Sequence, residues 1–148
     1  MEREILTELE IPAPVERVWQ VLTDSAAFPR WNPVVRRLRH RGPLLAGAPA
    51  LLTIELLPGR PPLVIPIRIR CVDHHRELSW EGGAGPLIRG VHYFRVAPLA
   101  ADRTCLSHGE RFSGPLVPLL WPALEPVLRR SYSAFNEALA ARVAATAP

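Results

Sequence analysis

Residues 124–142, LEPVLRRSYSAFNEALAAR, place apolar side chains three and four positions apart, with charged residues between them. Residues spaced in this way lie on one face of an α-helix, so the pattern is typical of an amphipathic helix that packs on a core. Its apolar members are Leu124, Val127, Leu128, Tyr132, Phe135, Ala138 and Leu139. The segment predicts one long C-terminal helix, which we expect to begin between Pro122 and Pro126.

Six strand-like runs precede this helix, and short breaks that hold mainly glycine, proline or aspartate separate them. Short links join antiparallel neighbours, so these runs predict a meander of strands. The expected strands are residues 35–41, 50–57, 63–72, 77–82, 88–96 and 104–112. A further strand is expected at residues 3–11, where alternation puts four side chains on one face: Ile5, Thr7, Leu9 and Ile11.

Residues 11–24, IPAPVERVWQVLTD, change from the alternating period to the helical one, with Pro14 at a first helical position. Residues 25–31 can form one more turn before Pro33. The full order predicts an α+β fold in which a curved antiparallel sheet of about seven strands surrounds the long helix. At 148 residues, the chain is expected to form a single ligand-binding domain over residues 1–148.

All 18 basic residues are arginine, and the net charge is +4. They are spread along the chain, so we expect no nucleic-acid partner. The one dense group comprises Arg36, Arg37, Arg39, His40 and Arg41. It can contact phosphate or anionic lipid, or it can protect an edge strand from pairing with neighbours, and we favour the edge strand.

The first residues, MEREILTE, lack the apolar region of a secretory signal, so we expect a cytoplasmic protein. The uncharged stretches 42–54 and 112–124 are shorter than the roughly 20 residues of a membrane helix. No transmembrane segment is therefore expected, although a peripheral membrane contact stays open. Residues 112–124, FSGPLVPLLWPAL, can form a lid or membrane-touching lip, or they can pack under the start of the helix.

A single helix, roughly 10 to 12 Å across, cannot fill a concave sheet of this width. The remaining space would be lined by inward-pointing strand residues and would bind a small hydrophobic molecule. In the last hairpin, a turn near Ala100 places Val96 opposite Thr104, Phe94 opposite Leu106 and His92 opposite His108. The predicted ligand-binding residues are Trp80, His92, Phe94, Leu106, His108, Glu110, Phe112, Leu124, Leu128 and Phe135.

Three interpretations apply to the polar members of this set, His92, His108 and Glu110. Two histidines and a carboxylate can bind a metal, but no third histidine is placed to help, and we expect neither metal nor cofactor. They can act as acid and base on a substrate, which makes all three candidate catalytic residues. They can also hydrogen-bond one another as polar anchors in an apolar pocket, which is the interpretation we favour.

Several segments resemble the START-like or Bet v1-like (SRPBCC) superfamily, and within it the polyketide cyclase/dehydrase-type proteins. These segments are IPAPVERVWQVLTD running into FPRWNPVV, then HYFRVAPL, TCLSHGERFSG and AFNEALAAR, and they cover nearly the whole chain. The resemblance implies the helix-grip fold, with two short helices after the first strand. The superfamily includes cyclases, aromatases, lipid carriers, hormone receptors and chaperone activators, and it has no common catalytic set to carry over.

The first functional hypothesis is therefore the binding, and by extension the transport, of a small hydrophobic molecule such as a lipid or polyketide-like compound. The second is a cyclase or dehydratase that uses the cavity histidines and Glu110. The third is an interaction module of the chaperone-activator kind. The sequence specifies no oligomeric state.

Overall fold

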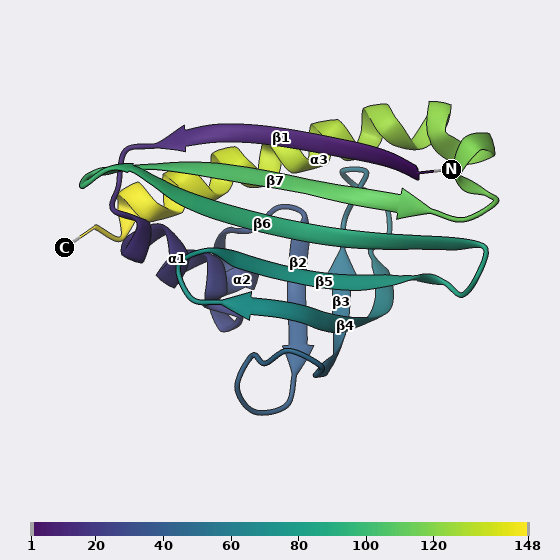
Figure 1. The fold of residues 1–148 in the computed structure, drawn as a ribbon, viewed down its shortest axis with the longest axis horizontal. Coiled ribbons are helices and arrows are strands. Elements are labelled where there is room, and N and C mark those ends of the chain that lie inside the picture. The colour runs from purple at the N-terminus through teal and green to yellow at the C-terminus, as the bar shows by residue number, and fades with distance from the viewer. Residues whose placement is uncertain (1, 148) are drawn as a thin grey trace.

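One strongly curved antiparallel sheet and one long helix dominate the computed structural model, which describes residues 2–147 (Figure 1). Across the sheet the strand order is β1-β7-β6-β5-β4-β3-β2. The strands are β1 (Glu2–Ile11), β2 (Val35–His40), β3 (Pro49–Ile54), β4 (Leu63–Asp73), β5 (Glu77–Ala84), β6 (Ile88–Ala100) and β7 (Arg103–Ser113). The helices are α1 (Val15–Thr23), the 3₁₀ turn η1 (Ser25–Ala27), α2 (Phe28–Trp31) and α3 (Val117–Ala145). The predicted helix-grip architecture is confirmed.

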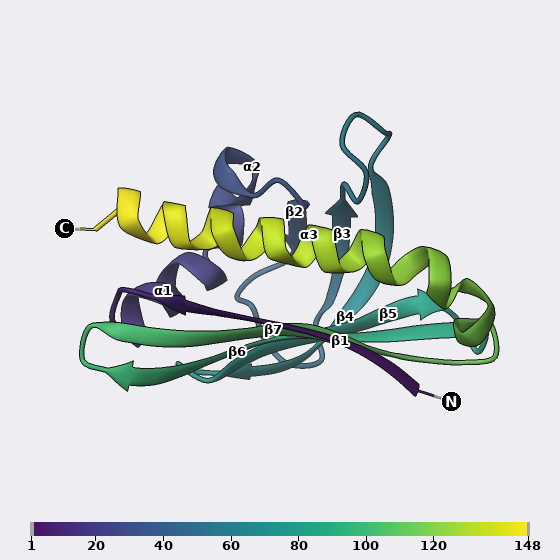
Figure 2. The same cartoon turned by 90° about the horizontal axis from the view of Figure 1, so that it is seen from above.

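The curvature of the sheet turns β2 and β3 across the direction of β6 and β7, and α3 lies along the concave face (Figures 1 and 2). Strand β1 shows why the sheet has one core face. Its Ile5 and Ile11 are buried against the interior, whereas the glutamates between them point outward. The strand at the opposite end of the sheet is β2, so the dense arginine group does lie on an edge strand, as favoured from the sequence.

Asn32 sets the path from α2 into β2. Its buried Oδ1 accepts hydrogen bonds from the backbone N–H groups of Val34, at 3.0 Å, and Val35, at 2.8 Å. Both valines are thereby held with their side chains toward the interior, where they line the cavity described below.

Helix α3 begins at Val117, so the predicted start between Pro122 and Pro126 is wrong. Pro118 lies at the second helical position, where a missing N–H costs nothing. Pro118, Pro122 and Pro126 are four residues apart and all exposed, so the helix carries them on its solvent side. Prolines bend a helix away from their own side, and the first turns of α3 curve toward the sheet in Figure 2.

The register of the β6–β7 hairpin also differs from the prediction. Val96 lies opposite Leu106, Phe94 opposite His108 and His92 opposite Glu110. The turn falls between Ala100 and Arg103, with a register shift after Pro98, so its centre lies further along the chain than the predicted Ala100. Moving a turn centre by one residue moves each partner by two, which leaves every side chain on its predicted face.

Candidate functional site

A cavity of about 200 Å³ lies between α3 and the concave face of the sheet. Eight of the ten predicted ligand-binding residues line it: Trp80, His92, His108, Glu110, Phe112, Leu124, Leu128 and Phe135. Aliphatic side chains complete the wall, and all but Ile88 of β6 come from β2, β3, β4 and the segments beside them: Val34, Val35, Leu52, Ile54, Leu56, Leu63, Ile65, Ile67 and Ile88. The alternation of Leu52 with Ile54, and of Ile65 with Ile67, is the sequence signal that could have found this second wall.

Phe94 and Leu106 do not line the cavity, although both were predicted to do so. They are buried in the packed part of the core, with exposures of 1% and 0%. The Phe94 ring stacks on the His108 ring, with centroids 4.4 Å apart, and contacts the Phe135 ring at 4.9 Å. Phe94 therefore supports the wall from behind.

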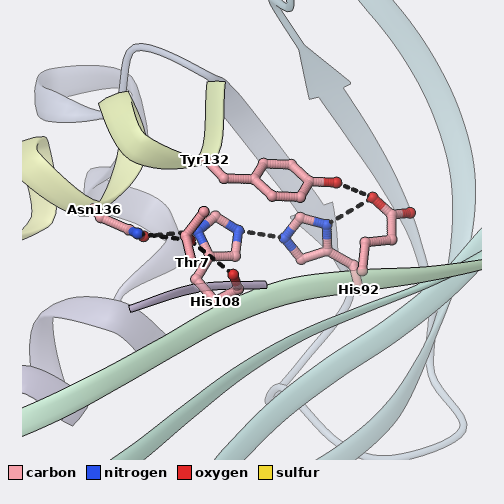
Figure 3. Close-up of polar contacts among 6 residues, drawn as sticks. Thr7, His92, His108, Tyr132 and Asn136 are labelled. Atoms are coloured by element: carbon pink, nitrogen blue, oxygen red, sulfur yellow. Dashed lines mark hydrogen bonds and ion pairs between the residues drawn. The ribbon is translucent and has the colours of Figure 1, made fainter. Parts of the chain in front are cut away.

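The polar residues form one continuous hydrogen-bonded chain across the end of the cavity (Figure 3). Asn136 Nδ2 donates to Thr7 Oγ1 at 2.8 Å, and Thr7 Oγ1 donates to the backbone carbonyl of His108 at 2.8 Å. The Nδ1 atom of His108 lies 2.7 Å from Asn136 Oδ1. These contacts join β1, β7 and α3 at one point.

The chain continues from His108 into the cavity wall. The Nε2 atoms of His92 and His108 lie 2.7 Å apart, and His92 Nδ1 lies 3.2 Å from Glu110 Oε2. The Tyr132 hydroxyl donates a hydrogen bond to the same Oε2 atom. The two predicted histidines and Glu110 are thus brought together, as expected from their shared face.

Aromatic rings hold both imidazoles in place. The His92 ring stacks on Trp80, with centroids 5.1 Å apart and planes 13° apart. The His108 ring lies between Phe94 and Tyr132, with centroids 4.4 and 4.6 Å away. These contacts restrict rotation of both rings, and the hydrogen bonds described above place their nitrogens.

Burial sets the protonation of two members of the chain. Desolvation, and then the neighbouring His92, hold the pKa of the His108 imidazole well below its ordinary value. His108 is therefore neutral near pH 7. Desolvation, and then the charge of Glu110, raise the pKa of the Tyr132 hydroxyl well above its ordinary value, so Tyr132 remains a donor.

Gly90 on β6 leaves room for the Glu110 carboxylate. A Cβ atom at this position would lie 2.1 Å from Glu110 Oε1, far inside van der Waals contact. Within residues 2–147, Oε1 makes no hydrogen bond with a protein group, whereas Oε2 has two partners. Oε1 is therefore a polar atom of the cavity wall that can accept a hydrogen bond from a bound molecule.

Sequence reasoning missed the polar roles of Thr7, Tyr132 and Asn136. Tyr132 and Asn136 lie four residues apart on the buried face of α3, between Leu128 and Leu139. A buried polar side chain needs a partner. The asparagine within an apolar helical stripe was therefore the signal that could have identified this end of the site.

Among the described residues, no group of three or more His, Cys, Asp or Glu side chains is arranged to hold a metal ion. The facing nitrogens of His92 and His108 are also directed at each other and not at a shared point.

Part of the segment 112–124 packs under the start of the helix, which was one of the two alternatives from the sequence, while the lid or membrane-touching lip stays a prediction. Phe112 and Val117 pack in a small core with Ile5, Leu128 and Tyr132. On the other side of the helix start, Leu119 is 75% exposed. No helix within residues 2–147 has the length and hydropathy needed to cross a bilayer.

Comparisons with known proteins agree with this architecture. The family model described as "Polyketide cyclase / dehydrase and lipid transport" matches residues 3–144. No curated protein matches the chain.

Solved structures with low sequence identity share the fold. The ZhuI aromatase/cyclase from Streptomyces sp. R1128 superposes with a TM-score of 0.79 at 18% identity, covering 97% of this chain and 94% of that one. A START superfamily protein from Mycobacterium smegmatis gives 0.78 at 18% identity, with coverages of 97% and 99%. Norcoclaurine synthase from Thalictrum flavum, in complex with dopamine and hydroxybenzaldehyde, gives 0.73 at 18% identity, with coverages of 100% and 90%.

Proposed function

Because the chain belongs to the polyketide cyclase/dehydrase and lipid transport family, we propose that its internal cavity binds a small, uncharged and largely apolar molecule. The observation that carries this proposal is the cavity of about 200 Å³, with an aliphatic wall and a single polar end. Residues 1–148 would act as one ligand-binding domain. The cytoplasm remains the predicted location, in keeping with the free thiols of Cys71 and Cys105.

The volume favours a compact ligand. An apolar cavity of about 150 Å³ admits benzene, whereas drug-sized ligands occupy roughly 300 to 1,000 Å³. A space of about 200 Å³ therefore suits a substituted ring or two fused rings. A long acyl chain would require the wall to open.

The electrostatics favour a ligand without negative charge. No arginine lies among the residues that line the cavity, and the chain contains no lysine. A carboxylate or phosphate on the ligand would lose its hydration without gaining a guanidinium partner, and it would face Glu110.

Three probes with the same ring system test this proposal by isothermal titration calorimetry: naphthalene, 1-naphthol and 1-naphthoate. We expect the two uncharged probes to bind and naphthoate to bind at least tenfold more weakly. Leu52→Phe, which places a ring in the cavity, should abolish binding, whereas Leu139→Phe lies outside the cavity lining and serves as the control. Equal binding of all three probes, or binding unaffected by Leu52→Phe, would contradict the proposal.

A second candidate is an acid–base enzyme of the cyclase or dehydratase type. It is favoured by the hydrogen-bonded pair of His92 and Glu110, which faces the cavity and can exchange a proton with a bound substrate. The test uses any compound that copurifies with the protein as the substrate. His92→Gln, His108→Gln and Glu110→Gln should each slow turnover by about 10²-fold or more, and unchanged rates would exclude this role.

A further inference from the structure

We propose that Thr7 and Asn136 are positioning residues that keep one exchangeable proton on the His92–Glu110 pair, and that Glu110 Oε1 consequently accepts a hydrogen bond from a ligand hydroxyl. The proton arrangement follows from the hydrogen bonds of the protein alone. The role of the ligand hydroxyl deepens the proposed binding function and rests on it.

The hydrogen bonds of Thr7 fix the orientation of the Asn136 amide. Thr7 has one hydroxyl proton, which it donates to the carbonyl of His108, so its oxygen must accept from Asn136 Nδ2. Asn136 Oδ1 then faces His108 Nδ1. A rotated amide would require the single Thr7 proton to be donated twice. His108 therefore carries its proton on Nδ1.

The protonation of His108 in turn determines which nitrogen of His92 carries a proton. A neutral His108 with its proton on Nδ1 has a lone pair on Nε2. The Nε2 atom of His92 lies 2.7 Å away and must supply the proton of that hydrogen bond. The Thr7–Asn136 arm therefore fixes a proton on His92 Nε2 without touching His92.

The contact between His92 and Glu110 requires one further proton. With Nε2 protonated, His92 Nδ1 faces Glu110 Oε2 at 3.2 Å. Without a proton between them, two lone pairs would face each other in a buried site. The proton lies either on Nδ1, giving an imidazolium and a carboxylate, or on Oε2, giving two neutral groups. In both forms the pair has no net charge.

Within the part of the chain that the structure describes, the second carboxylate oxygen of Glu110, Oε1, is left without a protein partner. Whether the shared proton is on Nδ1 or on Oε2, Glu110 Oε1 carries no proton and presents a lone pair to the cavity. Its partner on a ligand must therefore be a donor, such as a phenolic or enolic hydroxyl. An ether, ester or ketone offers only acceptors and would leave Oε1 unpaired, which disfavours such ligands.

Among the described residues that line the cavity, the titratable groups are those of His92, His108, Glu110 and Tyr132. Trp80 on β5 and Ile5 on β1 bring no titratable group, and Tyr132 on α3 stays protonated. The nearest further pair, Tyr93 and Glu4, hydrogen-bond each other at 2.6 Å on the outer face of the sheet.

The proton arrangement is tested by ¹⁵N NMR of the histidine rings in the protein without ligand. We expect His108 protonated on Nδ1 only and His92 protonated on Nε2. Thr7→Ser keeps the hydroxyl and should keep this pattern. Thr7→Val removes the hydroxyl, frees the Asn136 amide to rotate, and should give a population of His108 protonated on Nε2. A native His108 protonated on Nε2 would overturn the positioning role of Thr7 and Asn136.

The ligand preference is tested with 1-naphthol and 1-methoxynaphthalene, which share a ring system but differ in the donor. We expect naphthol to bind the native protein at least tenfold more tightly, and the ratio to approach one in Glu110→Ala. Equal affinities in the native protein would overturn the acceptor role of Oε1. If neither probe binds while the NMR pattern holds, the proposed ligand site fails and the proton arrangement stands.

Discussion

Gly90 shows how one missing side chain determines the polar end of the cavity. A glycine is not required here by a turn, because residue 90 lies within β6 opposite Phe112. It is required because Glu110 Oε1 approaches so closely that a side chain would collide with it. Any larger residue would have to displace the carboxylate, and with it the contacts to His92 and Tyr132.

Gly90→Ala is therefore expected to weaken binding of 1-naphthol by about tenfold, the value of roughly one lost hydrogen bond. The comparison that isolates the cause is the same substitution in Glu110→Ala, where the carboxylate is absent. In that background, Gly90→Ala should change the affinity little. An equal loss in both backgrounds, measured by calorimetry, would show that Gly90 acts through something other than Glu110.

His108 links the stability of the fold to pH. Its pKa is lower in the folded protein than in the unfolded chain, so the unfolded chain binds the extra proton first as pH falls. The contribution of His108 to stability is therefore present above about pH 6.5 and is lost as the pH falls below it, with a slope of up to about 1.4 kcal/mol per pH unit.

This slope is measured as the free energy of unfolding in urea between pH 7 and pH 5. His108→Gln keeps a polar side chain but cannot take up the proton, so its stability should depend less steeply on pH. Parallel curves for the native protein and the variant would contradict a buried neutral His108.

At the scale of elements, α3 carries its three regularly spaced prolines on the solvent side. Pro122 and Pro126 each remove a hydrogen bond to the carbonyl four residues earlier, and they bend the helix start toward the sheet. The bend places Leu124 and Leu128 against the cavity. The helix is therefore irregular in the part that covers the cavity.

Pro126→Ala is expected to stabilise the protein by about 1 kcal/mol, less than the roughly 3 kcal/mol intrinsic difference because the helix is already bent. It should also weaken probe binding, since a straighter helix start covers the cavity less well. Pro118→Ala, at the second helical position, is the matched control and should change neither quantity much. Thermal unfolding and calorimetry report the two effects, and a destabilised Pro126→Ala variant would contradict this account.

The sequence predicted the elements well because period and turn residues are local signals. Alternation put His92, His108 and Glu110 on one face, and this was correct even though the β6–β7 register was not. The helix start was missed because the rule against internal proline holds for straight helices. The partnership of Thr7 with Asn136 was beyond local reasoning, since these residues are 129 positions apart and meet only through the tertiary fold.

At the scale of the whole molecule, the cavity is a region of the core that side chains do not fill. Filling it should therefore raise the stability of the fold and abolish ligand binding. Leu52→Phe adds volume on the cavity wall and is expected to raise the melting temperature while abolishing probe binding. Leu139→Phe adds the same volume to a fully buried position outside the cavity and should lower it. Two variants with equal melting temperatures would show that the space is not a true void.

The pairing of β1 with β7 affects how the protein is made. Glu2 lies opposite Ser113, so β1 leaves the ribosome before its neighbour and cannot pair with it until more than a hundred further residues follow. During that interval both edges of β1 are unpaired and can pair with another nascent chain, whereas in the finished sheet one edge is covered by β7. The glutamates at positions 2, 4, 8 and 10 give this waiting strand a negative charge. The glutamates that keep the outer face of the finished sheet in contact with water therefore also oppose aggregation during synthesis.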